Sequence, residues 1–427
     1  MSVKNKLGQY FTKNILLKEK LYSFMLNDSI NILEPSIGRG DLIDYVIQQN
    51  KLKDQHQNQN QNQNINIVFD MYEIDNTIEL LDSINKNDVK FENFMDSIIN
   101  KKYSTIIGNP PYIRTKTGNL YINFIEKCYN LLDNNGEMIF IIPSDLFKLT
   151  SASKILNVMM HNGTFTHIFH PHNEKLFENA SIDVIIFRYC KNTNLDSKIA
   201  NTIIYNDKLM NIVNSNGMIT FCNANITNNE NIANNLSNLS INVIDSKVLV
   251  LFKDYFDIYV GIVSGRDDVY KNAALGNINV ITGNNKTDKF IFINKFPCNN
   301  EDINSYLLQN KNILISRKIK QFNDKNWFEW GAPRNIKTIE IHKGKSCIYL
   351  YNLSRKSTIA FKGTIDYFGG NLIMLKPKNN DIYNLDKIIL YLNSDDFKLN
   401  FMFSGRFKIG HRQISYSLFD KKIIIDN

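Results

Sequence analysis

Four consecutive residues, Asn109-Pro110-Pro111-Tyr112, are the part of the sequence best suited to chemistry. They follow an apolar, strand-like run, and the two prolines hold φ at about −65° and stiffen the loop. The Asn109 amide oxygen and the Pro110 carbonyl can then act as paired acceptors for one planar amino or amide group. A nitrogen held in this way becomes more tetrahedral and directs its lone pair at an electrophilic methyl. A sulfonium methyl needs little further activation, so no strong base is required.

Tyr112 adds an aromatic face on which a nucleic acid base could stack, a contact worth about 1–3 kcal/mol. The alternative is a proline-stiffened turn with a purely structural role. Two further segments, one at the end of each of the preceding strands, favour the chemical interpretation.

Residues 32–41 form the first of these segments, a buried strand that leads into Gly38-x-Gly40 and then a helix. Glycines let the backbone approach a ligand closely. The third glycine of the dinucleotide-binding motif is replaced by Ile43. Glu34, at the strand exit, would repel a phosphate but could pair with an ammonium group. This turn therefore favours a cofactor with an amino-acid part, although such a turn can also be structural only.

The second segment is the end of the next strand, Glu73-Ile74. An acidic residue at this position can accept hydrogen bonds from both ribose hydroxyls of an adenosine moiety. Ile74 could pack against the adenine ring.

Short apolar runs alternate with helical patterns through the first half of the chain. This alternation predicts a mostly parallel sheet covered on both faces, with ligands beyond the carboxyl ends of the strands. The expected strands are residues 31–34, 67–72, 105–108, 137–142, 165–169 and 184–187, and the expected helices are residues 15–25, 42–49, 78–84, 121–132 and 153–160. The Gln/Asn-rich residues 55–64 lack apolar side chains, so we expect a disordered loop there.

The order of these motifs resembles the gamma-class DNA adenine-N6 methyltransferases, typified by bacterial type II modification enzymes. Residues 8–12 match that family's amino-terminal cofactor motif, residues 33–40 its Gly-rich motif and residues 109–112 its catalytic motif. The resemblance covers residues 6–190 well and the C-terminal half only in general style. It implies an α/β fold in which a Rossmann-like methyltransferase sheet is followed by a C-terminal mixed α/β target recognition domain.

The resemblance implies that S-adenosyl-L-methionine is the cofactor and that the methyl acceptor is N6 of an adenine flipped out of duplex DNA. It assigns catalysis to Asn109, Pro110 and Tyr112. It assigns cofactor binding to Tyr10, Thr12, Glu34, Ser36, Gly38, Gly40, Glu73, Ile74, Asn93, Phe94 and Pro111. Asn93 departs from the aspartate usual at its position, and Asp96 is an alternative partner for the adenine of the cofactor.

Substrate contacts are expected from Phe177 and from basic residues near the C-terminus. The resemblance makes Phe177 the aromatic contact of the flipped adenine, with core packing as the alternative. Residues 1–190 carry 19 Lys and Arg against 21 Asp and Glu, whereas the remainder carries 31 against 21. This asymmetry favours a polyanion-binding second domain. Its densest basic segment contains Arg406, Lys408 and Arg412, for each of which a solvated surface is the alternative.

We therefore expect a catalytic domain over residues 1–190, a connecting region with one or two short strands over 191–243, and a DNA target recognition domain over 244–427. The partner is double-stranded DNA, the protein is a monomer, and a separate cognate restriction endonuclease is an expected further partner. The polar, lysine-rich N-terminus is not a signal peptide, and no apolar run is long enough to span a bilayer. These features suggest the cytoplasm, or the interior of a host cell if the chain is viral.

Two other features bear on chemistry. Five widely spaced cysteines, at positions 128, 190, 222, 298 and 347, indicate neither disulfides nor a zinc site. Histidines cluster between residues 161 and 172, but acidic or cysteine partners at suitable spacing are missing, and we expect no metal. Two rival functions stay open at this point: a protein glutamine methyltransferase, whose family shares Asn-Pro-Pro-Tyr, and a catalytically inactive DNA-binding relative.

Overall fold

The computed structural model describes residues 8–57, 67–115, 118–178, 180–192, 202–223, 249–379 and 383–424. Contacts between Cα atoms divide the chain into two compact units. The first comprises Met1–Ser240 with Phe403–Gly405, and the second comprises Ile241–Met402 with Arg406–Asn427. Among the helices that the structure describes, none is both long and apolar enough to cross a membrane.

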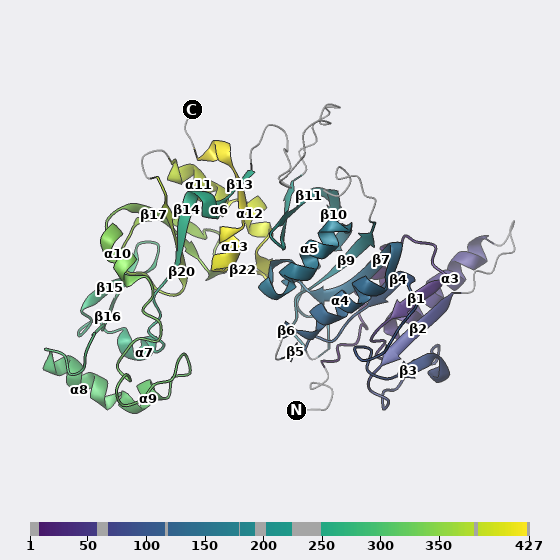
Figure 1. Cartoon of the computed structure of the whole chain (residues 1–427), viewed down its shortest axis with the longest axis horizontal. Helices are drawn as coiled ribbons and strands as arrows, with labels where there is room; N and C mark the ends of the chain where they lie inside the picture. Colours follow the sequence, from purple (N-terminus) through teal and green to yellow (C-terminus); the bar gives the residue numbers. More distant parts are fainter. Residues whose placement is uncertain are drawn as a thin grey trace. The chain divides into compact units, whose positions relative to one another are not determined.

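One large sheet forms the centre of the first unit (Figure 1). Its strand order is β12-β11-β10-β8-β9-β7-β4-β1-β2-β3. Strands β3, β2, β1, β4 and β7 run parallel to one another, and β9 is antiparallel to both β7 and β8. The bounds are β1 Asn31–Glu34, β2 Val68–Glu73, β3 Val89–Phe91, β4 Tyr103–Gly108, β7 Leu132–Pro143, β8 Gly163–Phe169, β9 Val184–Lys191, β10 Thr202–Tyr205, β11 Lys208–Ser215 and β12 Met218–Asn223. The predicted, mainly parallel sheet is confirmed.

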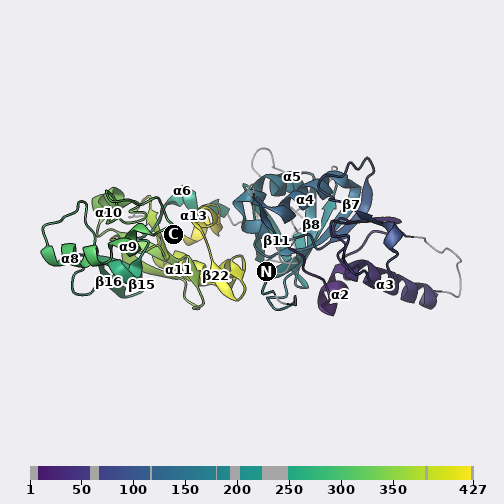
Figure 2. The same ribbon diagram turned by 90° about the horizontal axis from the view of Figure 1, so that it is seen from below.

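Helices cover both faces of this sheet, α4 and α5 on one and α2 and α3 on the other (Figure 2). Their bounds are α2 Ile15–Ser23, α3 Asp41–Gln57, α4 Leu120–Leu131 and α5 Ser153–His161. The unit also has three short 3-10 turns, η1 Lys86–Asp88, η2 Leu146–Lys148 and η3 Thr150–Ala152, among its described residues. A small hairpin consists of β5 Arg114–Thr115 and β6 Gly118–Asn119. Ile32, Ile107 and Ile139 of three adjacent strands pack against Leu21 of α2 and Val46 of α3. The strands are buried on both faces, which explains why they read as continuous apolar runs.

Hydrogen bonds to strands hold the chain on both sides of α2. Asn14 caps the helix by accepting a hydrogen bond from the Leu16 N–H at 3.1 Å. Beyond the end of the helix, the buried Glu137 carboxylate on β7 accepts the N–H groups of Leu26 and Asn27 at 3.1 Å each. Before the helix, the Tyr10 carbonyl and the Thr12 hydroxyl accept hydrogen bonds from Asn109, which directly follows β4.

Residues 78–84 are not helical, contrary to our prediction. Their backbone is tied to a neighbouring loop instead, since the Leu81 N–H donates to the Arg39 carbonyl at 3.0 Å. Ile84 is buried against the chain at Gly40. The apolar spacing that suggested a helix serves packing on the Gly-rich turn.

Two other expectations fall partly on residues that are not described. Of the predicted loop at residues 55–64, residues 55–57 belong to α3, and 58–64 lie outside the described residues. In the expected connecting region, β10, β11 and β12 extend the main sheet, β10 parallel to β8 and the others antiparallel. Residues 202–223 are therefore a sheet edge with three strands rather than a linker with one or two. Asn211 and Asn214 at partly exposed positions of β11 interrupt the apolar pattern of its buried side chains.

The second unit is a mixed α/β assembly of small antiparallel sheets. Its largest sheet has the order β14-β20-β17-β19 and packs Cys347, Tyr349, Phe368 and Met374 into one core. A second core surrounds Trp327 and Trp330. The strands are β13 Leu249–Leu251, β14 Phe256–Val260, β15 Ile278–Gly283, β16 Lys286–Phe290, β17 Ser346–Tyr351, β18 Leu353–Ser354, β19 Ala360–Thr364, β20 Leu372–Pro377, β21 Met402–Phe403, β22 Arg406–Lys408 and β23 Leu418–Asp420. The helices are α6 Phe252–Tyr255, α7 Asp267–Tyr270, α8 Glu301–Gln309, α9 Lys311–Ile315, α10 Ile336–His342, α11 Leu385–Asn393, α12 Asp395–Leu399, α13 His411–Ser415 and the 3-10 turn η4 Lys421–Ile423.

Lys148, in η2 of the first unit, is a buried cation whose ammonium donates to the Ile219 carbonyl. Burial lowers the pKa of Lys148 from 10.5 to about 7. The unfolded chain therefore holds a proton that the folded chain releases between about pH 7 and 10.5, so the free energy of unfolding rises with pH over this window. We expect Lys148→Met to stabilise the protein at pH 7 by about 1–3 kcal/mol, because it removes the cost of burying a charge.

Urea unfolding at pH 7 and pH 9 checks this prediction. The wild-type protein should gain stability between the two pH values, and Lys148→Met should gain less. Lys154→Met, on the exposed side of α5, serves as the control and should behave like the wild type. Equal pH dependence in Lys148→Met and the wild type would contradict the prediction.

Candidate active site

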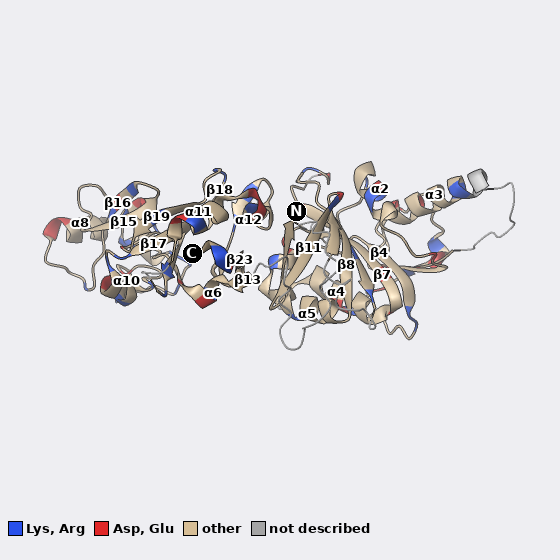
Figure 3. Cartoon of the chain, turned by 90° about the horizontal axis from the view of Figure 1, so that it is seen from above, with Lys and Arg blue, Asp and Glu red and all other residues tan. Residues whose placement is uncertain are grey.

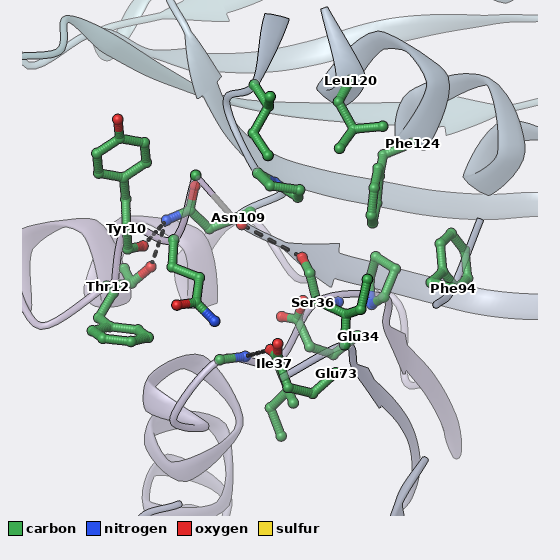
Figure 4. Close-up of a pocket in the computed structure, with 18 of the residues that line it drawn as sticks. Tyr10, Thr12, Glu34, Ser36, Ile37, Glu73, Phe94, Asn109, Leu120 and Phe124 are labelled. Carbon is green, nitrogen blue, oxygen red and sulfur yellow. Dashed lines mark hydrogen bonds between the residues drawn. The ribbon is translucent and has the colours of Figure 1, made fainter. Parts of the chain in front are cut away.

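A cavity of about 230 Å³ lies in the first unit where the carboxyl ends of β1, β2 and β4 meet. Figure 4 shows side chains from these strand ends and from the N-terminal segment facing it. It is lined by Gly8, Gln9, Tyr10, Phe11, Thr12, Glu34, Pro35, Ser36, Ile37, Gly38, Asp41, Leu42, Glu73, Ile74, Glu92, Asn93, Phe94, Met95, Asn109, Pro111, Ile113, Leu120 and Phe124.

Glu34 ends β1 with its carboxyl group buried, the residue being only 1% exposed. Its Oε1 accepts the Ser36 N–H at 3.2 Å. The same oxygen lies 2.8 Å from the position that a Cβ on Gly108 would take, and Phe140 Cε1 lies 3.2 Å from that position. Only glycine at the end of β4 therefore lets the Glu34 carboxyl group fit beside that strand.

Glu73 ends β2 and is also buried. Its Oε2 accepts the Gly38 N–H at 2.8 Å, and its Oε1 accepts the Asp75 N–H at 2.9 Å. Gly38 has φ of 58°, a left-handed conformation that glycine adopts without strain. The Gly-rich turn after β1 and the acidic end of β2 are thus joined by a direct hydrogen bond.

Acidic side chains give the cavity a negative character. Burial raises the pKa of Glu34 well above its usual range, the Ser36 N–H opposes this shift, and the nearby Glu73 charge adds to it. Burial also raises the pKa of Asp41, against the opposing charges of Arg39, Lys18 and Lys13. Such a site disfavours phosphate and stabilises a bound cation.

Asn109 directly follows β4, and two hydrogen bonds fix the orientation of its side-chain amide. Its Nδ2 donates to the Tyr10 carbonyl at 2.7 Å and to Thr12 Oγ1 at 3.0 Å (Figure 4). Its Oδ1 is an acceptor for the Tyr112 hydroxyl, which lies 2.9 Å from a second acceptor, the Ile141 carbonyl. One hydroxyl proton can serve only one acceptor at a time, so the Asn109 oxygen can take another donor when the Tyr112 hydroxyl turns to Ile141.

Three aromatic rings meet beside Asn109. The rings of Tyr10 and Tyr112 are stacked with centroids 5.4 Å apart, and Phe177 lies 5.9 Å from the first and 6.4 Å from the second. Phe177 belongs to the buried core, whereas Tyr10 and Tyr112 are only partly buried. Burial of its hydroxyl raises the pKa of Tyr112 well above 10, so this phenol stays neutral near pH 7.

The opposite end of the cavity is formed by Ile74 and by the loop after β3. Ile74 is 54% exposed, an unusual state for an isoleucine at a cavity rim. In the loop, Asn93 Oδ1 accepts the Met95 N–H at 3.1 Å, and Asn93 Nδ2 donates to Asp96 at 2.6 Å. Phe94 is buried, with its ring centroid 5.4 Å from that of Phe124 on α4.

Comparison with known proteins identifies the region that carries this site. Residues 9–177 match the family model of the Eco57I restriction-modification methylases. The type II methyltransferase M.HincII of Haemophilus influenzae is 30% identical over 218 residues, which cover 46% of this chain and 39% of that protein. Residues 9–177 are therefore similar to the restriction-modification methylases.

A second type II methyltransferase is similarly related. The type II methyltransferase M.MjaIV of Methanocaldococcus jannaschii is 30% identical over 186 residues, or 36% of this chain and 60% of that protein. The matched part thus spans about two fifths of M.HincII and three fifths of M.MjaIV. The solved structure of the type IIL restriction-modification enzyme MmeI in complex with DNA aligns over 97% of this chain and 64% of that one, with a TM-score of 0.54 and 10% identity. At this identity the likeness shows the fold, and it confirms the expected α/β fold class.

The structure gathers most of the predicted methylase site residues at the cavity. All predicted cofactor-binding residues except Gly40 line it, as does Asn109. Gly40 faces the other way, since a Cβ there would lie 2.5 Å from Ile84 Cγ1, so its glycine serves packing. Among the predicted catalytic residues, Pro110 and Tyr112 do not line the cavity, although Tyr112 contacts Asn109. Asp96, our alternative to Asn93, contacts Asn93 instead of the cavity.

Several lining residues were missed from the sequence. Asp41 begins α3 directly after the Gly-rich turn, and Glu92 directly precedes Asn93, so adjacency could have indicated both. Leu120 and Phe124 lie one turn apart on α4, in the amphipathic stripe of that helix. Gln9 lies inside the amino-terminal motif and donates to Asp75 at 3.2 Å.

The clustered histidines lie on different elements: His161 ends α5, His167 lies on β8, and His170 and His172 follow that strand. His170 Nε2 lies 2.9 Å from Asp183 Oδ1, and the rings of His170 and His172 have centroids 3.8 Å apart. Within the described part of the chain, no three His, Cys, Asp or Glu side chains are grouped as metal ligands would be.

The predicted basic residues belong to the second unit, where Lys and Arg are spread over several elements (Figure 3). Arg406 and Lys408 are exposed at the two ends of β22, and Arg412 on α13 lies with its guanidinium 5.4 Å from the Tyr416 ring centroid. A further basic run, Arg317-Lys318-Ile319-Lys320, is partly structural. Arg317 is buried and donates to four backbone carbonyls, those of Ser264, Leu314, Trp327 and Glu329.

Proposed function

We propose that this protein is a site-specific DNA methyltransferase that transfers a methyl group from S-adenosyl-L-methionine to N6 of an adenine flipped out of duplex DNA. The observation that carries this proposal is the fixed Asn109 amide beside an acidic cavity at the carboxyl ends of the central strands. The match of residues 9–177 to the Eco57I restriction-modification methylase model supports the same reaction class.

The donor set of the cavity fits this cofactor. Glu34 is a buried carboxylate suited to the cofactor's ammonium group, which would also relieve the repulsion between Glu34 and Glu73. Each Glu73 oxygen accepts one backbone N–H and keeps capacity to accept a ribose hydroxyl. Ile74 offers an exposed apolar face to the adenine, beside Asn93 and Phe94. The remaining proposed contacts are Tyr10, Thr12, Ser36, Gly38 and Pro111.

Asn109 would orient the nitrogen that is methylated. Because Tyr10 and Thr12 hold its Nδ2, the amide presents oxygen to the substrate, and a target amino group would replace the Tyr112 hydroxyl at that oxygen. The Pro110 carbonyl is the proposed second acceptor. The bound cofactor supplies an electrophilic methyl on sulfonium. The Asn109 oxygen and the Pro110 carbonyl would hold the N6 amino group with its lone pair directed at this methyl, and the proton that N6 releases on methylation would pass to water.

The neutral Tyr112 phenol does not act as a base in this scheme; its ring would stack on the target adenine. The Tyr10 ring stacks on one face of the Tyr112 ring. A target base must therefore either displace the Tyr10 ring or stack on the opposite face of Tyr112. Rotation of the Tyr10 side chain leaves the bond from Asn109 to the Tyr10 carbonyl intact. Phe177 would form a second aromatic wall of the base site.

We further propose that the second unit binds the duplex as a target recognition domain. Residues 191–427 carry 31 Lys and Arg against 21 Asp and Glu, which favours phosphate contacts. Arg406, Lys408 and Arg412 are the proposed contacts. We also propose that the protein is a monomer and that it has a separate cognate restriction endonuclease.

One labelling experiment tests the proposed function. Purified protein is incubated with methyl-tritiated S-adenosylmethionine and unmethylated plasmid DNA, or with a protein extract, and the products are separated. The proposal expects tritium in DNA, recovered as N6-methyldeoxyadenosine after digestion. Label in methylated glutamine or in N4-methyldeoxycytidine would overturn it, as would failure to bind the cofactor in equilibrium dialysis.

A further inference from the structure

Lys127, in the middle of α4, reaches across to the loop that follows β3. Its Nζ donates to the carbonyls of Phe94, Met95 and Ser97, the last two at 3.2 Å and 2.8 Å. The ammonium also lies 4.6 Å from the centroid of the Phe94 ring, which adds a cation–π contact. One ammonium group therefore binds three backbone carbonyls of a single short loop.

That loop is a wall of the cavity, because residues 92–95 line it. Its turn is closed by the Asn93 carbonyl, which accepts the N–H groups of Asp96 and Ser97 at 3.0 Å and 3.2 Å. The Phe94 carbonyl accepts the Ser97 N–H at 3.3 Å, and the carbonyls of Phe94, Met95 and Ser97 all reach the Lys127 ammonium on α4. A carbonyl that is shielded from water costs about 1–3 kcal/mol when it lacks a hydrogen-bond donor.

A lysine is well suited to bind these three carbonyls. Its ammonium has three donors for three carbonyls, and its four-carbon stem spans the gap from the helix. Burial lowers the pKa of Lys127 from 10.5, whereas Cys128, Asp96 and Glu92 oppose the shift. The helix that carries Lys127 also contributes Leu120 and Phe124 to the cavity. The lysine thus links two walls of one site, the loop and the helix.

We propose that Lys127 is a positioning residue that sets the shape of the cofactor-adenine wall, so that Asn93 and Phe94 can discriminate adenine from other bases. This inference rests on the proposed function, because it takes the cavity to be the cofactor site. Lys127 does not line the cavity itself and acts only through residues 93–97.

The test substitutes Lys127→Met, which keeps the apolar stem and removes the three donors. Titration calorimetry with S-adenosylhomocysteine and with its inosine analogue measures both affinity and base preference. We expect the affinity of Lys127→Met for the adenine ligand to fall about tenfold. The preference for adenine over hypoxanthine should shrink, and kcat at saturating cofactor should stay within about twofold of the wild type. Lys127→Arg, which keeps several donors, should recover most of the affinity.

Lys191 supplies a matched control. It is also a lysine that binds carbonyls of α4 and its exit, those of Tyr129 and Leu132 at 3.3 Å and 3.0 Å, and it lies 4.8 Å from the Tyr129 ring centroid. These carbonyls do not line the cavity. Lys191→Met should therefore leave cofactor affinity and base preference unchanged.

Each outcome decides the inference. Wild-type affinity and base preference in Lys127→Met, or an equal loss in Lys191→Met, would overturn the role of Lys127 while the proposed function stands. A wild-type protein that binds neither ligand would overturn the proposed function as well. If Lys127→Met does not fold, Lys127→Arg and Lys127→Gln decide, since the positioning role requires base preference to follow the number of donors retained.

Discussion

Replacing Asn109 by alanine is expected to lower the rate of methyl transfer by about a hundred- to a thousandfold, the usual cost of losing one fixed hydrogen-bonding group at a reacting centre. The substitution removes the oxygen that would hold the amino group and the Nδ2 that bonds to Tyr10 and Thr12. The affinities for cofactor and DNA should change much less, because neither rests mainly on this side chain. Single-turnover transfer of tritium from S-adenosylmethionine to unmethylated plasmid, with calorimetry for the cofactor, gives both quantities.

Asn109→Asp separates the two halves of the amide. It retains an acceptor for the amino group but loses the donor that fixes the orientation, so we expect intermediate activity. Thr12→Val removes one acceptor of the Asn109 Nδ2 and should cost less than either change. Methyl transfer by Asn109→Ala at the wild-type rate would contradict the proposed mechanism.

Glu34→Gln is expected to lower cofactor affinity by about a hundredfold, since it removes one partner of a buried charge pair. The same substitution should stabilise the protein without cofactor at neutral pH. Burial raises the pKa of Glu34, so the ionised carboxylate is costly until a cation binds. Calorimetry with S-adenosylhomocysteine and urea unfolding of both proteins measure the two effects.

The sign of the pH dependence follows from the raised pKa. Between 4.5 and the higher pKa of the folded state, the folded chain keeps a proton that the unfolded chain has released. The contribution of Glu34 to the free energy of unfolding therefore falls as pH rises through this window. Cofactor affinity should change in the opposite direction, because the ammonium pairs with the carboxylate. Glu34→Gln should lose both dependences, and a variant with wild-type affinity at every pH would contradict the assignment.

The sequence predicted the cavity well because strand ends have local signatures. Glu34, Glu73 and Asn109 each follow an apolar run, and parallel strands must bring their carboxyl ends to one edge. Gly38 was predictable from the Gly-x-Gly turn after β1, and its φ of 58° is a conformation that glycine adopts without strain. The orientation of the Asn109 amide was not predictable, because its partners, Tyr10 and Thr12, are about a hundred residues away in the chain.

The features that the sequence did not predict have a common cause. The spacing of apolar or basic residues does not reveal what each side chain contacts. Residues 78–84 have helical spacing but pack on the Gly-rich turn. Arg317 stands in a basic run, yet it donates to a cluster of backbone carbonyls. Lys127 has no local signature in the sequence, and only the fold brings it to the loop at residues 94–97.

Sequencing that detects modified bases, applied to DNA from a methylation-free host that expresses this protein, tests the central claim most directly. The account predicts N6-methyladenine at one short sequence throughout the host DNA, and none in cells that express Asn109→Ala. Unmodified adenine with the wild-type protein present and folded, or modification confined to cytosine, would contradict it.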